Sequence, residues 1–366
     1  MRLEHLKIRN FRNLEAAELE VAPETTILFG RNGAGKTNTL EAAHLALCGK
    51  SFRTRKALEM VMEGEVFLRV EARGQATGAT FDREVALEAG GAEKRGNALA
   101  KEPLPVVCFT PDDLSLVKGP PAQRRKYIDR SIARKHPRHG RTVADLEKAL
   151  MQRNSFLERA GSGLVGLSDI SPWDKQVAAL SARVYQERFR FCKGLEEPFR
   201  VTYREISGNG TPAEMALTSQ MEPFDEDDIE AELLEQLKSR WQTDMEKGTT
   251  GLGAHRDDVD FRVGGRNGRS HGSRGEQRLA VLALLLAEVE SMALNGAGRP
   301  LVMLDDVMSE LDPARRRLLM ERLKAGGQVI ITATDRDSVP GRAGAGSDLY
   351  EVDSGCIRRA RTAINV

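Results

Sequence analysis

The chain has 366 residues, enough for two domains or one large domain at roughly 150 residues per domain. The chain has 55 lysines and arginines against 54 aspartates and glutamates, a formal net charge of +1. Its total charge therefore gives no indication of a nucleic-acid partner, and any such signal must come from a local basic patch. The 40% hydrophobic content excludes a disordered chain, and the lack of any run of about 18 apolar residues excludes a membrane-spanning one.

Period-two alternation predicts strands in the first part of the chain. Apolar and charged residues alternate around Leu6 and Ile8 and again from Ala17 to Val21, and a β-rich run ends at Phe29. Further patterns predict a helix over residues 39–47, an antiparallel hairpin over 66–72 and 80–87, and a strand over 105–109. This segment therefore combines strands with one early helix.

Helical spacing replaces this pattern after Gly119, Pro120 and Pro121. It is found in four segments, which glycine- and proline-rich stretches help to separate, over residues 122–135, 143–160, 173–193 and 225–247. Unbroken heptads of a long coiled coil are missing from the sequence. The pattern predicts a helical insertion, or arm domain, over residues 121–248.

Strands and helices alternate again toward the C-terminus. The patterns predict strands over 259–263, 301–304 and 329–332, a helix over 275–294, a second helix after Pro313, and a β-rich tail. Alternating elements at both ends of the chain indicate an α/β fold with a mixed, mostly parallel sheet. We expect one discontinuous head formed by residues 1–120 and 249–366.

A nucleotide-binding loop follows the strand that ends at Phe29. It fits the pattern G-x-x-x-x-G-K-[ST] and consists of Gly30, Arg31, Asn32, Gly33, Ala34, Gly35, Lys36 and Thr37. Glycines let successive N–H groups point at one phosphate, and the start of the following helix adds partial positive charge. We predict that Lys36 contacts the β- and γ-phosphates of ATP as a catalytic residue, and that Thr37 holds Mg²⁺.

Two carboxylates, Asp305 and Asp306, directly follow the apolar strand over residues 301–304. Ligands of α/β proteins bind at this carboxyl edge of the sheet. Together with the loop, the pair predicts that Asp305 holds Mg²⁺ and that Asp306 orients or deprotonates the attacking water. A solvated turn or a helix cap is the alternative for two adjacent acids.

A second phosphate-binding half-site is indicated before the helix over 275–294. Its residues are Ser273, Arg274, Gly275, Glu276 and Gln277, and they resemble the signature motif of ABC-type ATPases, which begins Ser-Gly-Gly. A serine hydroxyl and free N–H groups at a helix start form an anion cradle. An ordinary capping box, with glutamate three residues after serine, is the alternative.

Matches spread over nearly the whole chain resemble the RecF family, which belongs to the DNA-repair branch of ABC-type ATPases together with SMC proteins. They cover residues 8–13, 33–38, 49–54, 111–114, 117–119, 253–257 and 304–312. Transporter subunits have the acidic strand much closer to the phosphate loop, and SMC chains carry very long coiled coils in the gap. The sequence is therefore identified as a member of the RecF family.

The resemblance implies an ABC-type ATPase head with a helical insertion lobe. In such ATPases the signature motif of one subunit closes over ATP held by the other, which implies a homodimer with two ATP molecules at its interface. It also implies a D-loop after Asp306, formed by Ser309, Glu310, Leu311 and Asp312.

The function implied is that of an ATP-dependent DNA-binding clamp in recombinational repair and replication-gap processing. ATP drives homodimerisation on DNA, and slow hydrolysis by a weak, DNA-stimulated ATPase releases it. ATP and Mg²⁺ are the expected cofactors, DNA and RecR with RecO the expected partners, and the cytoplasm, on the nucleoid, the expected location. An ABC transporter subunit and a soluble small-molecule kinase are the alternatives.

Two departures from the wider ABC pattern predict slow hydrolysis. Asp306 stands where many relatives have the longer glutamate, so the attacking water is positioned less tightly. The segment over residues 331–335 lacks the usual switch histidine. Both features suit a timed clamp better than a motor.

Two basic segments are candidate DNA contacts. Residues 121–141 hold eight lysines and arginines against one acid, and the candidates there are Arg124, Arg125, Lys126, Arg130 and Arg134. The second segment, after the phosphate-loop helix, contributes Arg53 and Arg55, and the resemblance to SMC heads implies that an arginine there couples DNA to ATP. For the first segment the alternatives are pairing with the acidic stretch over 222–235 and a solvated face; for the second, the alternative is a surface turn.

Two further segments have an open role. Arg12 and Asn13 either approach the nucleotide, as the corresponding segment does in relatives, or form a salt-bridged strand end. His255, Arg256 and Asp257 either brace a hairpin or take part in a site.

Overall fold

The computed structural model describes residues 1–54, 56–88, 94–95, 102–163, 170–208, 210–221, 226–294, 299–340 and 346–360. The chain divides into two compact units. Unit 1 consists of Met1–Leu114 and Leu282–Val366, and unit 2 consists of Ser115–Val281. Among the described residues, no helix is both long and apolar enough to span a membrane.

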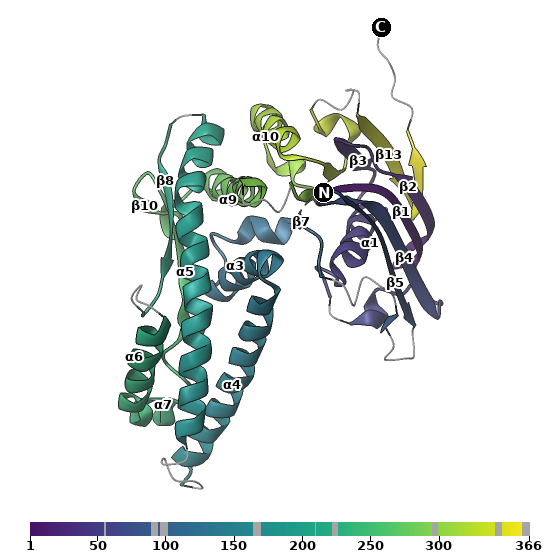
Figure 1. Ribbon diagram of the computed structural model, residues 1–366. Helices are drawn as coiled ribbons and strands as arrows, with labels where there is room; N and C mark the ends of the chain where they lie inside the picture. Colours follow the sequence, from purple (N-terminus) through teal and green to yellow (C-terminus); the bar gives the residue numbers. More distant parts are fainter. Residues whose placement is uncertain are drawn as a thin grey trace. The chain divides into compact units, whose positions relative to one another are not determined.

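Unit 1 contains an antiparallel sheet of five strands. Its order is β2 (Leu14–Glu20), β1 (Arg2–Phe11), β4 (Phe67–Ala76), β5 (Ala79–Glu88) and β6 (Lys94–Arg95). Leu6 is opposite Leu19 on β2 and Ala72 on β4, so apolar residues of neighbouring strands share one face. Strands β2, β1, β4 and β5 lie next to one another in Figure 1. The alternation read from the sequence is thus the pattern of a half-buried sheet.

A second, six-stranded sheet of unit 1 carries the sequence motifs. Its order is β14 (Cys356–Arg359), β13 (Ser347–Asp353), β3 (Thr25–Phe29), β12 (Val329–Ala333), β11 (Leu301–Leu304) and β7 (Val106–Phe109). All neighbours are parallel except β14 and β13. Because β12 lies between β3 and β11, the residues that follow these three strands meet at one edge of the sheet.

The core of unit 1 joins the two sheets through α1 (Lys36–Cys48). Leu40, Leu45 and Leu47 of this helix belong to the same buried cluster as Ile8 of β1 and Met303 of β11. Nearly every side chain of α1 is buried, as expected for a helix that is covered on all sides. The helix that begins in the phosphate loop is therefore fixed by apolar packing along its length.

Unit 1 also contains α10 (Pro313–Gly326) and several short 3₁₀ turns. These turns are η1 (Ala57–Glu59), η5 (Met308–Glu310), η6 (Arg336–Ser338) and the first part of η2 (Pro111–Ser115). The α/β class predicted from the sequence is confirmed by this architecture. The antiparallel hairpin and the parallel strands expected from the sequence are both present, but they belong to two separate sheets, one antiparallel and one mainly parallel.

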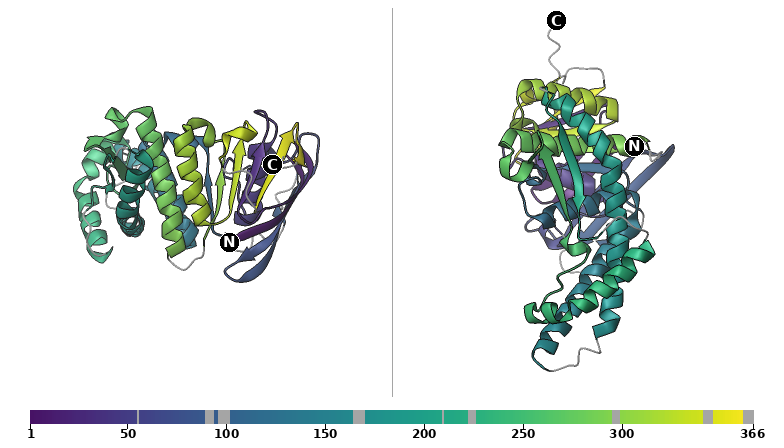
Figure 2. Two further views of the ribbon diagram at one scale, coloured as in Figure 1. Left: turned by 90° about the horizontal axis from the view of Figure 1, so that it is seen from above. Right: turned by 90° about the vertical axis from the view of Figure 1, so that its left-hand side faces the viewer.

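Unit 2 is built on helices and a small antiparallel sheet. The helices are α3 (Pro121–Lys135), α4 (Pro137–Gly161), α5 (Ser171–Ser207), α6 (Glu226–Ser239), α7 (Trp241–Lys247) and α8 (Gly268–His271). The sheet has the order β10 (Arg266–Asn267), β9 (Asp258–Val263) and β8 (Ala213–Thr218), and η4 (Ala254–Arg256) precedes it. Helices α4 and α5 lie side by side (Figures 1 and 2). The boundary between the units falls within α9 (Arg274–Leu294).

Two elements of unit 2 differ from the expectation. Helix α5 continues past Pro198 because Leu195, Phe199 and Tyr203 are buried along its later turns, and packing outweighs the missing proline N–H. Strand β8 was not predicted, since its Ala-rich sequence has a weak strand preference. It forms because it pairs with β9 along its whole length.

A buried ion cluster ties the helices of unit 2 together. The fully buried Arg153 donates from Nε to Asp174 at 2.8 Å and from Nη1 to Asp244 and Thr250 at 2.9 Å each. Trp241 donates to the other oxygen of Asp174 at 2.7 Å. The cluster therefore joins α4, α5 and α7, and removing one member would leave a charge buried without its partner.

Candidate nucleotide-binding site

The phosphate loop joins β3 to α1. Gly30 has φ +155°, and a Cβ there would lie 2.1 Å from the carbonyl oxygen of Val352, so only glycine fits. Gly35, with φ +121°, turns the chain into α1. Arg31, Asn32 and Gly33 are exposed at the tip of the loop. The loop therefore presents its backbone at the edge where the parallel strands end.

Lys36 is folded onto this loop. Its Nζ donates to the carbonyls of Gly30 at 2.7 Å and Arg31 at 2.9 Å. Burial lowers the pKa of Lys36 from its ordinary value, and the carboxylates of Asp306 and Asp305 act in the opposite direction. The cation thus lies between the loop and the acid pair.

The acid pair meets the phosphate loop directly. The hydroxyl of Thr37 lies 2.8 Å from Oδ1 and 2.9 Å from Oδ2 of Asp305. One hydroxyl and one carboxylate form a donor set that fits Mg²⁺, because this ion takes few protein ligands and completes its shell with phosphates and water. Thr37 and Asp305 would hold the ion, which would neutralise charge on the phosphates.

Asp306 has an unusual backbone. Its φ is +48°, in the left-handed region that few residues other than glycine adopt. Its N–H donates to the hydroxyl of Thr332 at 2.8 Å, and its carbonyl accepts from the hydroxyl of Ser309 at 2.8 Å. The residue predicted to handle water is therefore fixed on both sides.

Sequence reasoning missed Thr332. Its hydroxyl is fully buried and also donates to Oδ1 of Asp305 at 2.7 Å. A hydroxyl within the otherwise apolar residues of β12 was the available signal. The contact itself could not be read from the sequence, because it depends on β12 being next to β11.

A cluster of polar residues around Glu41 was also not predicted from the sequence. Glu41 lies on α1 and is fully buried. Its carboxylate accepts from Arg12 at 2.5 and 2.8 Å, from Ser51 at 2.5 Å and from Arg53 at 3.3 Å. Arg12 is therefore a salt-bridged strand end, one of the two alternatives. Glutamate within an otherwise well-buried helix was the signal for this cluster.

Asn13 contacts the phosphate loop. Its Nδ2 donates to the carbonyl of Gly33 at 3.2 Å, and its Oδ1 accepts from Asn38 at 2.7 Å. Asn38 in turn accepts from Arg53 at 2.9 Å. A chain of hydrogen bonds thus joins Arg53, whose side chain is 45% exposed, to the loop.

The signature residues begin α9 as a capping box. The N–H of Ser273 donates to Glu276 at 2.8 Å, and the N–H of Glu276 donates to the Ser273 hydroxyl at 3.3 Å. These hydrogen bonds lower the pKa of Glu276. Ser273 and Arg274 are exposed, so the capping box leaves the start of the helix open to solvent. Gln277 is buried and donates to the carbonyl of Gly268 at 2.9 Å.

The predicted D-loop runs from η5 to the start of α10. Ser309 contacts the Asp306 carbonyl, Leu311 is buried, and Asp312 caps α10 by accepting from the N–H groups of Ala314 and Arg315. Glu310 belongs to η5. This segment therefore connects the acid pair to the next helix.

The basic candidates on α3 have different environments. Arg124 is 3% exposed, pairs with both oxygens of Asp258 at 2.6 and 2.8 Å, and donates to the carbonyls of Leu116, Val117 and Gly119. Its prediction as a DNA contact needs correction, because its donors are engaged inside unit 2. Its partner Asp258 also lies outside the acidic stretch proposed as the alternative.

Other candidates lie closer to solvent. Lys126 is exposed, Arg130 stacks on Tyr127 with its guanidinium 5.3 Å from the ring centroid, and Arg134 is half-buried. Arg125 is half-buried and donates to the carbonyl of Asp257 at 2.7 Å. Arg55 and residues 222–225 of the acidic stretch lie outside the described residues.

His255, Arg256 and Asp257 form a brace. His255 and Arg256 both contact the carbonyl of Thr250 at 2.9 Å, and Asp257 pairs with the buried Arg188 at 3.0 Å. Burial lowers the pKa of His255 to about 4. The structure thus favours the bracing alternative.

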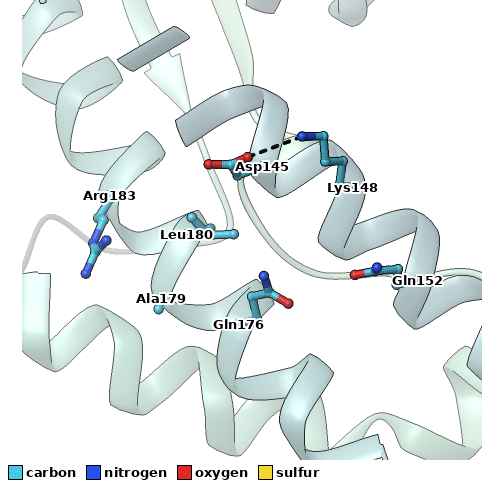
Figure 3. A pocket seen from close by; sticks show the side chains of 7 residues that line it. All are labelled: Asp145, Lys148, Gln152, Gln176, Ala179, Leu180 and Arg183. Atoms are coloured by element: carbon cyan, nitrogen blue, oxygen red, sulfur yellow. Dashed lines mark ion pairs between the residues drawn. The ribbon is translucent and has the colours of Figure 1, made fainter. Parts of the chain in front are cut away.

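A separate surface hollow of about 410 Å³ lies on the helical part of unit 2. Asp145 and Lys148 form an ion pair of 3.6 Å within it (Figure 3). No residue of the sequence motifs lines it; its lining residues are Asp145, Lys148, Gln152, Gln176, Ala179, Leu180 and Arg183. It is therefore separate from the nucleotide motifs.

Comparison with known proteins identifies the family. The model of the AAA domain family matches residues 5–244. The DNA replication and repair protein RecF of Myxococcus xanthus (strain DK1622) is 35% identical over 98% of this chain and 97% of its own length. That of Heliobacterium modesticaldum (strain ATCC 51547 / Ice1) is 34% identical over 98% of this chain and 100% of its own.

Solved structures agree with this relationship. The recombination mediator protein RecF with ATP, in the RecFOR pathway, has a TM-score of 0.86 at 27% identity and covers 98% of this chain and 97% of its own. An SMC head bound to the C-terminal winged-helix domain of ScpA covers 100% of this chain and 98% of its own with a TM-score of 0.58, and at 14% identity it shares the fold alone. The chain therefore belongs to the RecF family of DNA replication and repair proteins, with an ABC-type ATPase fold.

Proposed function

We propose that this chain is an ATP-dependent DNA clamp that acts in recombinational repair and at replication gaps. Two copies close on ATP and Mg²⁺, hold DNA, and release it when ATP is slowly hydrolysed. The observation that carries this proposal is the direct contact between Thr37 and Asp305, which joins the phosphate loop to the acid pair. Membership of the RecF family supplies the repair context.

Unit 1 supplies the residues that hold ATP. Backbone N–H groups from Gly30 to Thr37 bind the phosphates, and Lys36 exchanges its two carbonyl partners for phosphate oxygens. The bound phosphates favour the charged form of Lys36, against the burial that lowers its pKa. Asn13, already on the Gly33 carbonyl, keeps the loop in shape.

The second half of each site comes from the partner copy. In this proposal, Ser273 and the open start of α9 bind the phosphates held by the other chain's loop. The exposure of Ser273 and Arg274 supports this, because a group that works across an interface must be accessible before dimerisation. Two such sites related by a two-fold axis close the dimer.

Hydrolysis then depends on Asp306. Its carboxylate orients the attacking water and accepts its proton, while Lys36 stabilises charge that develops on the phosphates. Aspartate is shorter than the glutamate of many relatives, and Ile331 to Asp335 contain no histidine. We therefore assign a weak ATPase, stimulated by DNA, in which the waiting time before hydrolysis sets how long the clamp holds.

The DNA surface we propose centres on the accessible basic residues of α3 and the start of α4. Lys126, Arg138 and Arg141 are exposed, and Arg130 and Arg134 are half-buried between them in sequence. Such residues neutralise phosphates without reading bases. Arg53 is a second contact, joined through Asn38 and Asn13 to the phosphate loop.

RecR, with RecO, is the protein partner that the family implies, and the solved RecF structures belong to the RecFOR pathway. The transporter and small-molecule kinase alternatives gain no support from relatives that are all DNA replication and repair proteins.

The test is a mass measurement by sedimentation, with and without ATP and Mg²⁺, repeated with DNA. A clamp doubles its mass only with ATP, and the doubled species carries DNA. A constant mass under all conditions, with ATP bound, would reject the dimer and leave only a nucleotide-binding protein.

A further inference from the structure

Thr332 is in direct contact with both residues of the acid pair. Its hydroxyl lies 2.7 Å from Oδ1 of Asp305 and 2.8 Å from the backbone nitrogen of Asp306. A carboxylate accepts hydrogen bonds and an N–H donates them, so the hydroxyl proton goes to Asp305 and its oxygen accepts from Asp306. Both hydrogen-bonding directions of one hydroxyl are thus used on the two acidic residues.

We propose that Thr332 is a positioning residue of the ATPase reaction, which sets the carboxylate of Asp305 for Mg²⁺ and the backbone of Asp306 for water. The inference rests on the roles proposed above for the two aspartates. It goes beyond them because it assigns both orientations to a single side chain on a third strand.

Two hydroxyl groups hold the carboxylate of Asp305. Thr37 and Thr332 contact the same carboxylate, but Thr37 is itself a proposed ligand of the ion. Thr332 comes from β12, between β3 and β11, and holds the carboxylate from the protein side. Residues that orient a metal ligand in this way change metal affinity by about 10- to 100-fold.

Asp306 has φ +48°, a left-handed conformation that costs free energy for most residues with a side chain, although aspartate and asparagine tolerate it better than the others. This backbone sets the direction in which its carboxylate leaves the strand. Thr332 satisfies its N–H, while Ser309 of the D-loop donates to its carbonyl. Loss of the Thr332 hydroxyl removes one of these two restraints and leaves the N–H without that partner.

Core packing alone does not require this hydroxyl. The other residues of β12 are Val329, Ile330, Ile331 and Ala333, all buried, and valine has nearly the shape of threonine. Thr26 of β3 is a matched comparison, because it is 1% exposed and its hydroxyl accepts the N–H of Ala22 at 3.0 Å. Both threonines lie in the same sheet, but Thr26 contacts neither aspartate.

The experiment compares Thr332→Val, Thr332→Ser and Thr26→Val with the parent chain. Three quantities are measured: ATP affinity with EDTA, the Mg²⁺ concentration that half-saturates the ATP complex, and kcat. For Thr332→Val we expect unchanged affinity in EDTA, a half-saturating Mg²⁺ concentration raised about 10-fold or more, and a kcat lowered about 10- to 100-fold. In Thr332→Ser, the half-saturating Mg²⁺ concentration and kcat should both lie within about threefold of the parent values. In Thr26→Val, both should equal the parent values.

Thermal unfolding without ligand separates positioning from packing. If Thr332→Val and Thr26→Val lower Tm alike but only the former changes the Mg²⁺ requirement, the positioning role holds. Parent-like Mg²⁺ dependence and kcat in Thr332→Val overturn it, as does a serine variant as impaired as the valine variant. If ATP binding by the parent chain does not depend on Mg²⁺, the result overturns instead the proposed function on which the inference rests.

Discussion

The hydroxyl of Thr37 lies 2.8 Å from a carboxylate oxygen of Asp305, although the two residues are 268 positions apart in the chain. The contact exists because β3 and β11 flank β12 in one parallel sheet, so the segments after them meet at its carboxyl edge. The intervening Ser115–Val281 form a compact unit of their own. The nucleotide site of unit 1 is thus assembled from the two ends of the sequence.

Lys36→Ala removes the ammonium group that faces the phosphates. We expect ATP affinity to fall about 100-fold, since two charge-assisted hydrogen bonds are lost, and ATP-dependent dimerisation to disappear. Lys50→Ala is the control, an exposed lysine just after α1. Titration with a fluorescent ATP analogue checks both, and parent-like affinity in Lys36→Ala would contradict the site.

Asp306→Asn keeps the shape and the left-handed backbone, which asparagine tolerates well. Without a base, kcat should fall about 100- to 10,000-fold while ATP and Mg²⁺ still bind through Thr37 and Asp305. The ATP-bound dimer should consequently last longer. Sedimentation after dilution measures the lifetime of this dimer. If the dimer of Asp306→Asn lasts no longer than the parent dimer, Asp306 is not the base and another residue must take that role.

Ser273→Arg separates ATP binding from closure. The monomer should bind ATP as the parent does, because the phosphate loop belongs to the other unit. An arginine at the start of α9 should block dimerisation and hydrolysis, and weaken DNA binding with a loss of its ATP dependence. Ser273→Ala is the milder comparison, which loses only the hydroxyl of the capping box. The proposal is contradicted if Ser273→Arg still forms dimers with ATP and its DNA affinity depends on salt as that of the parent does. Residues 273–277 would then be only a helix cap.

Two basic residues of α3 should behave in opposite ways. Lys126→Ala should leave unfolding unchanged and reduce the salt slope of DNA affinity by about 1, as for one lost phosphate contact. Arg124→Ala should instead cost about 3 kcal/mol of stability, since it leaves Asp258 and three carbonyls without their partner. Urea unfolding and a salt titration distinguish them, and the reverse pattern would refute this assignment.

His255 should make stability depend on pH. Burial lowers its pKa from 6.5 to about 4, so below pH 6.5 the unfolded chain binds a proton that the folded chain does not. Stability should therefore fall as the pH falls from 6.5 toward 4, by about 2 kcal/mol between pH 6.5 and 5 from this residue. Urea unfolding at several pH values measures the free energy of unfolding of the parent and of His255→Gln. The decrease on acidification should be smaller in the variant by about that amount, and the same pH dependence in both proteins would contradict the lowered pKa of His255.

Much of the site was predictable because its motifs are local. The phosphate loop, the acid pair and the start of α9 are each contiguous, and their flanking strands and helices have clear periodicity. What the sequence could not give are contacts between distant segments. Thr332 contacts Asp305 only because β12 lies next to β11 in the sheet. Arg12 and Arg53 pair with Glu41 only because the fold buries α1.

Burial also explains the one basic residue that needed correction and the strand that was missed. Arg124 has the same sequence signal as Lys126, but it faces Asp258 on β9 rather than solvent. Strand β8 owes its form to pairing with β9 and not to its own composition. In both cases tertiary contacts outweigh a local pattern.

The two-chain site is tested most directly by mixing Lys36→Ala with Ser273→Arg. Each variant alone should lack ATPase activity. In a mixed dimer, the loop of the Ser273→Arg chain meets an intact Ser273, while the substituted arginine faces a loop that holds no nucleotide. Neither variant is expected to dimerise with itself, so the dimers of an equal mixture are mixed and each has one complete site. The mixture should therefore regain up to about half of the parent's activity. A mixture no more active than either variant alone would contradict the proposal that two copies of this chain build each ATP site together.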